Sequence, residues 1–312
     1  MNEHLVNAEW TVIINPVSGD GKGRRDWESI AALLTQNGLI FKHYFSEYAR
    51  HGVELTKELI RNGRTCFIVV GGDGFLNEIV NGVFSQQDID THRITIAMIP
   101  VGTGNDWVRS FNIPFNYKGA VETIRKGKTR LHDIGKVYFQ RDQKELSWYF
   151  INMCGIGFDA EVNKKVNANK GHGHQGPLKY QYHIFTTLLS YFPVMLKLNV
   201  DGKPSFHDTF SATVAIANYN GGGMMQSPYA VPDDGIFDVT IIRKISKLKV
   251  IASVKRLYDG SFTKMPEVVC LTGKEISIDA LPLAWLEADG EALGHSPFRF
   301  EMLPSALSVI IT

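Results

Sequence analysis

The residues best suited to chemistry stand in Phe67–Val80, FIVVGGDGFLNEIV. Phe67–Val70 is an apolar run typical of a buried strand, and from residue 75 onward apolar residues recur at helical spacing. Glycines at 71, 72 and 74 have no side chains, so they leave backbone N–H groups accessible at a helix N-terminus, where phosphate can bind. A carboxylate at Asp73 would repel phosphate unless a cation lies between them, so we interpret Asp73 as facing Mg²⁺, directly or through water. The alternative is a tight turn in which Asp73 caps the helix.

Two further loops carry similar residues and also follow apolar strands. They are Asn15–Gly23, NPVSGDGKG, and Val101–Asp106, VGTGND. Strands that alternate with helices predict a parallel sheet covered on both faces, with ligands at the carboxyl ends of its strands. Lys22 is followed by Gly23 instead of Ser or Thr, so the first loop is not a Walker loop, although its amides and Lys22 could still cradle phosphate. One such loop could be an ordinary turn, but three at one sheet edge favour a phosphate site.

The second half of the chain has a different pattern. From near Asp133, apolar strands are separated by turn pairs such as Asp201-Gly202, which is typical of antiparallel β structure. We therefore predict an α/β domain with a parallel sheet at residues 1–132 and an antiparallel β-sandwich domain at residues 133–312, whose last strand is expected to return to the first domain. The expected elements include strands at Trp148–Met153, Phe298–Met302 and Leu307–Ile311 and helices near residues 180–191 and 247–258.

The composition, 44% hydrophobic and 21% charged, is that of an ordinary globular protein. A formal net charge of +1 without a dense basic run argues against nucleic acid as a partner. Three cysteines without CxxC spacing suit a reducing cytoplasm and argue against disulfides or structural zinc. The N-terminus has no signal pattern and no stretch is long enough to span a bilayer, so we expect a cytoplasmic protein with only peripheral membrane contact. The sequence does not fix the oligomeric state, and a homodimer is one alternative.

Taken together, the motifs resemble those of bacterial lipid kinases of the diacylglycerol kinase catalytic-domain family, relatives of sphingosine and ceramide kinases. The resemblance covers nearly the whole chain, and the ordered set is far more specific than any single motif. The matching residues are Asn15-Pro16, Ser18-Gly19, Gly71–Gly74, Asn77-Glu78, Pro100, Gly102-Thr103, Asn105-Asp106, Gly155–Ala160, Asp234-Gly235, Asp238 and Asp289–Glu291.

The resemblance implies an ATP- and Mg²⁺-dependent kinase that phosphorylates a hydroxyl of a diacylglycerol-like or sphingoid lipid at a membrane surface. Glu291 would be the general base, which takes the proton of a poorly nucleophilic alcohol, and Asp73 would act through the Mg²⁺ of the nucleotide. A structural Mg²⁺ site matches the main-chain carbonyls of Val231 and Ile236 and the side chain of Asp234. The residues that match ATP contacts are Asn15, Pro16, Ser18, Gly19, Ser46, Gly71, Gly72, Asp73, Gly74, Phe75, Leu76, Asn77 and Thr103.

One residue departs from the family's pattern, because Phe75 stands where Thr usually follows the GGDG run. Either backbone N–H groups suffice for phosphate binding, or nucleotide binding is altered. Two alternatives therefore stay open: an NAD kinase, from a related family that shares GGDG and an Asn-Glu pair, and a catalytically weak lipid- or nucleotide-binding regulator. Without the resemblance, Asp289–Glu291 is an ordinary Asp-Gly hairpin with Glu291 in solvent.

Overall fold

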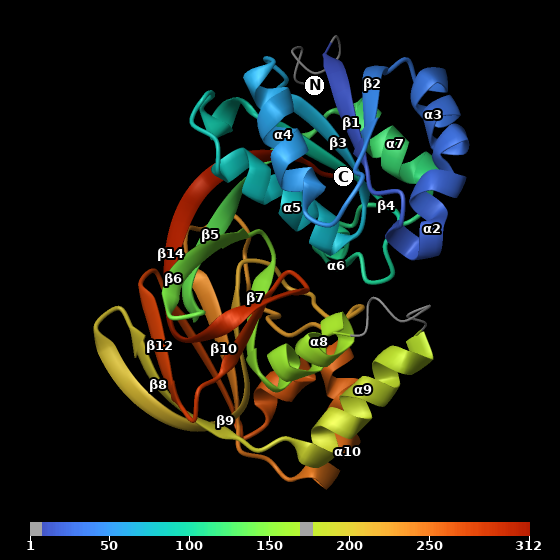
Figure 1. Cartoon of the computed structure of the whole chain (residues 1–312). Coiled ribbons are helices and arrows are strands. Elements are labelled where there is room, and N and C mark those ends of the chain that lie inside the picture. The colour runs from blue at the N-terminus through green and yellow to red at the C-terminus, as the bar shows by residue number, and fades with distance from the viewer. Residues whose placement is uncertain (1–7, 169–176) are drawn as a thin grey trace. The chain divides into compact units, whose positions relative to one another are not determined.

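The computed structural model describes residues 8–168 and 177–312, which belong to two compact units (Figure 1). The first unit holds the chain up to Ile134 together with Pro304–Thr312, and the second holds Gly135–Leu303. Two long strands, β5 (Thr129–Arg141) and β14 (Glu291–Ile310), contribute residues to both units. The chain therefore leaves the first unit along β5 and re-enters it along β14.

The first unit is built on a parallel sheet with the strand order β2-β1-β3-β4, and the end of β14 pairs in parallel with β4. Ile14 is level with Phe45 on one side and Val70 on the other, and Gly71 is level with Pro100. The carboxyl ends of these strands therefore lie along one edge of the sheet. The strands are β1 (Glu9–Ile14), β2 (Ile40–Phe45), β3 (Cys66–Gly71) and β4 (Thr95–Pro100).

Helices cover this sheet and take the spacing that their apolar residues predict. One layer contains α4 and α5, which pack against each other, and another contains α3 and α7 (Figure 1). Leu76, Ile79 and Val80 of α5 are wholly buried, so α5 is anchored directly after β3. The helices are α2 (Ser18–Arg25), α3 (Trp27–Gln36), α4 (His51–Arg61), α5 (Asp73–Phe84), α6 (Asp106–Ser110) and α7 (Tyr117–Lys126).

The second unit is an antiparallel sandwich. β9 pairs with β7 and β10 along its second half and with β8 along its first half, while β14 pairs with β13 and then with β12. Its core contains Phe150, Phe237 and Phe298. The strands are β6 (Lys144–Phe150), β7 (Met153–Gly157), β8 (Val194–Val200), β9 (Lys203–Ala215), β10 (Phe237–Arg243), β11 (Val268–Gly273), β12 (Ile276–Leu281) and β13 (Trp285–Ala288), and the helices are α8 (Phe158–Ala168), α9 (Pro177–Ser190) and α10 (Lys247–Tyr258).

The predicted order of an α/β unit with a parallel sheet followed by an antiparallel sandwich is confirmed. The ranges expected as strands at Phe298–Met302 and Leu307–Ile311 are extended, but they belong to one strand, β14, which ends at Ile310. Ser305 between them is left-handed (φ 51°), and its N–H donates to Asp133 Oδ1 at 2.6 Å. The strand expected at Trp148–Met153 is confirmed in part, because β6 covers its first three residues and ends at Phe150, and β7 begins at Met153. Within the part of the chain that the structure describes, no helix has the length and apolar character needed to cross a membrane.

Candidate functional site

Three loops of the first unit meet at the carboxyl ends of its parallel strands. A Cβ atom on Gly19 would lie 2.1 Å from the carbonyl oxygen of Val101, and a Cβ atom on Gly102 would lie 2.5 Å from Cα of Gly72. Side chains do not approach backbone so closely, so the three loops are in backbone contact and these positions require glycine. The prediction that the three loops converge is confirmed.

The loop after β1 has an unusual backbone. Residues 19–21 are left-handed in succession, with φ of 60°, 56° and 84°, inside the segment that begins α2. Ahead of them, Asn15 Oδ1 accepts the N–H of Val17 at 3.1 Å. Successive N–H groups in such turns can form a concave site for an anion. The exposed Lys22 adds positive charge beside this loop.

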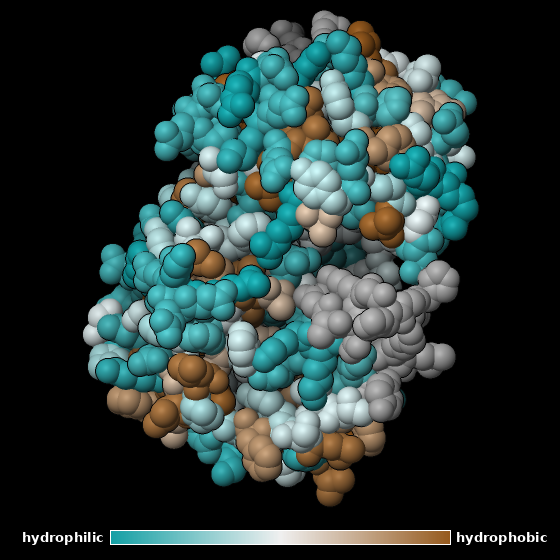
Figure 2. Space-filling view, in the orientation of Figure 1, coloured by the Kyte–Doolittle hydropathy of each residue, from teal (hydrophilic) through white to brown (hydrophobic). Residues whose placement is uncertain are grey.

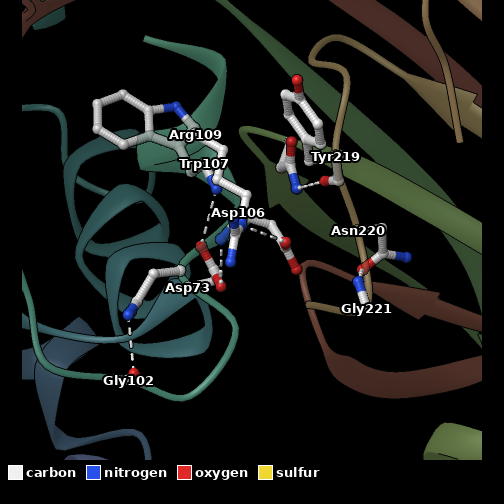
Figure 3. A network of polar contacts seen from close by, with 10 residues as sticks. Asp73, Gly102, Asp106, Trp107, Arg109, Tyr219, Asn220 and Gly221 are labelled. Atoms are coloured by element: carbon white, nitrogen blue, oxygen red, sulfur yellow. Dashed lines mark hydrogen bonds and ion pairs between the residues drawn. The ribbon is translucent and has the colours of Figure 1, made fainter. Parts of the chain in front are cut away.

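Asp73 is the first residue of α5, but its carboxylate does not cap that helix. Gly72 is the N-cap, whereas Asp73 Oδ2 accepts the N–H of Asp106 and Asp73 Oδ1 accepts the N–H of Trp107, both at 3.0 Å. These donors lie in the first turn of α6, so Asp73 stabilises the N-terminus of a different helix (Figure 3). The alternative in which Asp73 caps its own helix is wrong. Burial raises the pKa of Asp73, and the backbone N–H groups that it accepts oppose this rise.

A second carboxylate shares the space in front of Asp73. Asp73 Oδ2 and Asp106 Oδ2 each lie 3.2 Å from the position that a Cβ atom on Gly104 would take, so both face the same small gap. Asn105 is 6% exposed; its Nδ2 donates to the carbonyl of Gly102 at 2.7 Å, while its Oδ1 has no hydrogen-bond partner among the described residues. Carboxylate and amide oxygens are the donors that Mg²⁺ prefers. Oxygens of this kind suit Mg²⁺, and Arg109 Nε, 3.5 Å from Asp106 Oδ1, offsets part of the negative charge that would hold such an ion.

Three of the predicted ATP contacts, Phe75, Leu76 and Asn77, lie in α5 beneath the glycine loop that follows β3. The N–H groups of Phe75 and Leu76 both donate to the carbonyl of Gly72 at 3.0 Å. The Phe75 ring is 4% exposed, and a Cβ atom on Gly71 would lie 2.7 Å from it. Leu76 and Asn77 are wholly buried. Phe75 and Leu76 therefore pack beneath the loop, and Asn77 Oδ1 accepts the side-chain amide of Asn81 at 3.2 Å.

The other predicted contacts lie on the loops themselves. Ser46 directly follows β2, and its N–H donates to the carbonyl of Ile14 at 2.9 Å. Thr103 is exposed. It lies between Gly102, which contacts Gly72, and Gly104, which faces the carboxylates of Asp73 and Asp106. Pro16 and Ser18 are half-buried in the first loop. All four belong to the first unit.

In the second unit, the predicted turn Asp289–Glu291 is a hairpin between β13 and β14. Asp289 and Gly290 are both left-handed, with φ of 47° and 88°, as two-residue hairpins of the common kind require. Asp289 is 4% exposed, and its carboxylate accepts the N–H groups of residues 151, 152 and 153 at 2.8 to 3.0 Å. These three bonds fix the hairpin on the sheet and thereby fix the backbone of the half-buried Glu291.

Sequence analysis missed Glu287, which is 2% exposed in β13. Its carboxylate accepts the N–H of Gly290 at 2.9 Å and the side-chain amides of Asn163 and Asn220, each at 3.2 Å. Glu287 therefore joins the hairpin to α8 and to the loop after β9. Burial raises its pKa to about 8, and the negative charge of Asp159 adds to this effect. The available signal was an acidic residue inside the apolar strand WLEA.

The residues of the predicted structural Mg²⁺ site lie in the loop before β10. Asp234 Oδ1 accepts the N–H of Ile236 at 3.0 Å, and Val231 is 41% exposed. Burial raises the pKa of the nearby Asp238 to about 6, with a contribution from the charge of Asp234. Among the side chains that the structure describes, no three of His, Cys, Asp or Glu gather as a metal-binding group. An ion in this loop would thus depend on main-chain carbonyls and water.

Comparison with known proteins gives matches along nearly the whole chain. Residues 9–137 match the diacylglycerol kinase catalytic domain, and residues 152–311 match the YegS C-terminal NAD kinase β-sandwich-like domain. YtlR of Bacillus subtilis, a protein named as a lipid kinase, is 30% identical to this chain over 97% of this chain and 99% of the YtlR chain. A diacylglycerol kinase of Staphylococcus aureus is 29% identical over 96% of this chain and 90% of its own. The fold is that of a diacylglycerol kinase from Bacillus anthracis, with a TM-score of 0.71 and 20% identity over 97% of both chains.

Proposed function

We propose that this chain, which belongs to the family of lipid kinases with a diacylglycerol kinase catalytic domain, transfers the γ-phosphate of ATP to a hydroxyl of a diacylglycerol-like or sphingoid lipid. The family makes the chain a phosphotransferase with an alcohol group as acceptor. The use of ATP and Mg²⁺ and the identity of the lipid are the parts that we add. The relatives named diacylglycerol kinase make diacylglycerol the first lipid to test.

The observation that carries the proposal is the backbone contact of the three glycine loops in the first unit. Phosphoryl transfer depends mainly on positioning and on neutralising charge, and bare backbone amides supply both for a triphosphate. In our proposal the loops at Gly19, Gly72 and Gly102 hold the phosphates. Asp73 and Asp106 would hold the Mg²⁺, which supplies charge neutralisation when bound.

At the acceptor end, we assign the proton of the lipid hydroxyl to the carboxylate of Glu291. A carboxylate is a suitable acceptor because it takes the proton as the oxygen attacks phosphorus. Asp289 and Glu287 do not take part in the proton transfer in this proposal. They hold the hairpin through the N–H groups of residues 151–153 and of Gly290.

The test is transfer of labelled phosphate from ATP to lipid in mixed micelles, across diacylglycerols, sphingoid bases and ceramides. Formation of a phosphorylated lipid that requires Mg²⁺ and one lipid class supports the proposal. No product with any of these lipids counts against it. In a parallel reaction, NAD replaces the lipid, and accumulation of NADP would favour the NAD kinase alternative.

The regulator alternative depends on Phe75 in place of Thr. The Phe75 ring is 4% exposed and packs on Gly71, so in our proposal backbone N–H groups alone replace the hydroxyl that Thr would offer to phosphate. Tight binding of Mg-ATP in a calorimeter, without transfer to any lipid, would nevertheless favour a regulator.

A further inference from the structure

The outer surface of α9 and α10 in the second unit exposes large apolar side chains. Phe192 is 78% exposed directly after α9, and Leu248 is 80% exposed in the first turn of α10. Leu189 and Ile251 are also more than half exposed. Single exposed apolar residues are normal, but a group of them on adjacent helices usually marks an interaction surface.

These residues lie on one continuous surface. The Lys247 side chain joins the two helices, because its ammonium donates to the carbonyl of Leu189 and lies 5.7 Å from the centre of the Phe192 ring. Figure 2 shows apolar surface at the lower end of the view, where α9 and α10 lie in Figure 1. We call Leu189, Phe192, Lys247, Leu248, Ile251 and Lys255 the docking face.

The opposite side of the same helices is firmly packed. Leu188 of α9 is 4% exposed in a cluster with Phe158 and Phe210, and Val250 of α10 packs against this cluster. The helices are therefore held on the sandwich by their inner sides. The exposure of the docking face is thus a property of the folded unit and does not reflect detached helices.

The two helices themselves carry only positively charged side chains, although Glu267 pairs with Lys249 and Asp259 directly follows α10. α10, KLKVIASVKRLY, has three lysines, one arginine and no acidic residue, and α9 has one lysine and no acidic residue. The whole chain has a formal charge of only +1, so positive charge is concentrated here. A helix with apolar side chains beside Lys and Arg is the pattern of helices that lie in the interface of anionic membranes.

We propose that the docking face seats the second unit on the surface of an anionic lipid bilayer. Leu248, Ile251 and Phe192 enter the boundary between headgroups and acyl chains, and Lys247 and Lys255 contact the anionic headgroups. A homodimer through this face is disfavoured, since it would bring together two copies of a face that carries lysines and no acidic residue. The proposal is independent of kinase activity.

The test is sedimentation of the full chain with vesicles of phosphatidylglycerol and phosphatidylcholine, without ATP or diacylglycerol. The variant Leu248→Glu/Ile251→Glu should lose binding by about tenfold or more. Ile40→Glu is the control, because Ile40 is 64% exposed on β2 of the first unit, against 52% for Ile251. This control should bind like the wild type, and circular dichroism should show both variants folded.

A second variant tests the charge. Lys255→Gln should bind these vesicles less and should show a weaker dependence of binding on salt, while binding to pure phosphatidylcholine stays weak for all proteins. Unchanged vesicle binding in Leu248→Glu/Ile251→Glu would overturn the proposal, as would an equal loss in Ile40→Glu. Conversion of a dimer to a monomer by the double glutamate variant, with vesicle binding retained, would show that the face is a subunit interface.

Discussion

Replacing Gly102 by Ala separates the loops on which the nucleotide site depends. The new methyl group would lie 2.5 Å from Cα of Gly72 and 2.8 Å from Asn105 Oδ1. The nearest atom belongs to backbone, so the loops must move apart, and overpacking of this kind costs about 1 to 3 kcal/mol of unfolding free energy. We also expect the KM for Mg-ATP to rise about tenfold or more, because small displacements of groups that position phosphates are costly.

Gly82→Ala is the matched control for this prediction. There the methyl group would lie 2.6 Å from Cβ of Thr56 and 2.8 Å from the carbonyl oxygen of Val53, in the contact between α4 and α5. Urea unfolding and steady-state kinetics should show that both variants lose stability, whereas only Gly102→Ala loses affinity for Mg-ATP. Wild-type affinity in Gly102→Ala, or an equal loss in Gly82→Ala, would refute the assignment of the loops.

Three further predictions concern buried residues. Phe75→Thr should lower the unfolding free energy by about 3 kcal/mol through loss of a buried ring, without raising phosphate transfer; higher transfer would show that the ring obstructs the site. Glu287 ionises near pH 4.5 in the unfolded chain and near pH 8 in the folded one, so between these values the folded state binds the extra proton and loses stability as pH rises. From pH 5 to 8 the unfolding free energy measured in urea should therefore fall for the wild type relative to Glu287→Gln by roughly 1 kcal/mol per pH unit, and parallel pH curves would contradict the burial argument. Asp289→Asn leaves three backbone N–H groups facing an amide, so thermal unfolding should reveal a loss of about 2 kcal/mol, and an unchanged Tm would disprove the role of this carboxylate.

The fold and the convergence of the loops were predictable because they follow from local pattern. Apolar runs that end at glycines specify strands and turns, and parallel strands bring their ends to one edge. The identity of the groups that Asp73 contacts was not predictable, since its donors are more than thirty residues away in another helix. Likewise, Pro304 and Ser305 are residues that usually end a strand. The hydrogen bond from Ser305 to Asp133 within the long strand β14 is a tertiary contact, which the local sequence does not reveal.

Buried charge was the signal that sequence reasoning could have used and did not. Glu287 lies among buried apolar residues of β13 and Asp289 directly follows that strand, which places an acidic side chain inside the sandwich. Such a residue needs polar partners, and here these are amides from three separate segments. These partners are far from Glu287 in the sequence. The sequence motifs therefore indicated Glu291 but not Glu287, which holds the hairpin of Glu291.

The most direct test of the proposed reaction compares the wild type with Glu291→Gln, and with Glu301→Gln as a control from the exposed part of the same strand. Transfer of labelled phosphate to diacylglycerol and binding of Mg-ATP are measured on the same preparations. We predict that Glu291→Gln binds Mg-ATP like the wild type but transfers phosphate about a hundredfold more slowly, while Glu301→Gln matches the wild type in both. Wild-type transfer by Glu291→Gln would contradict the proposed base.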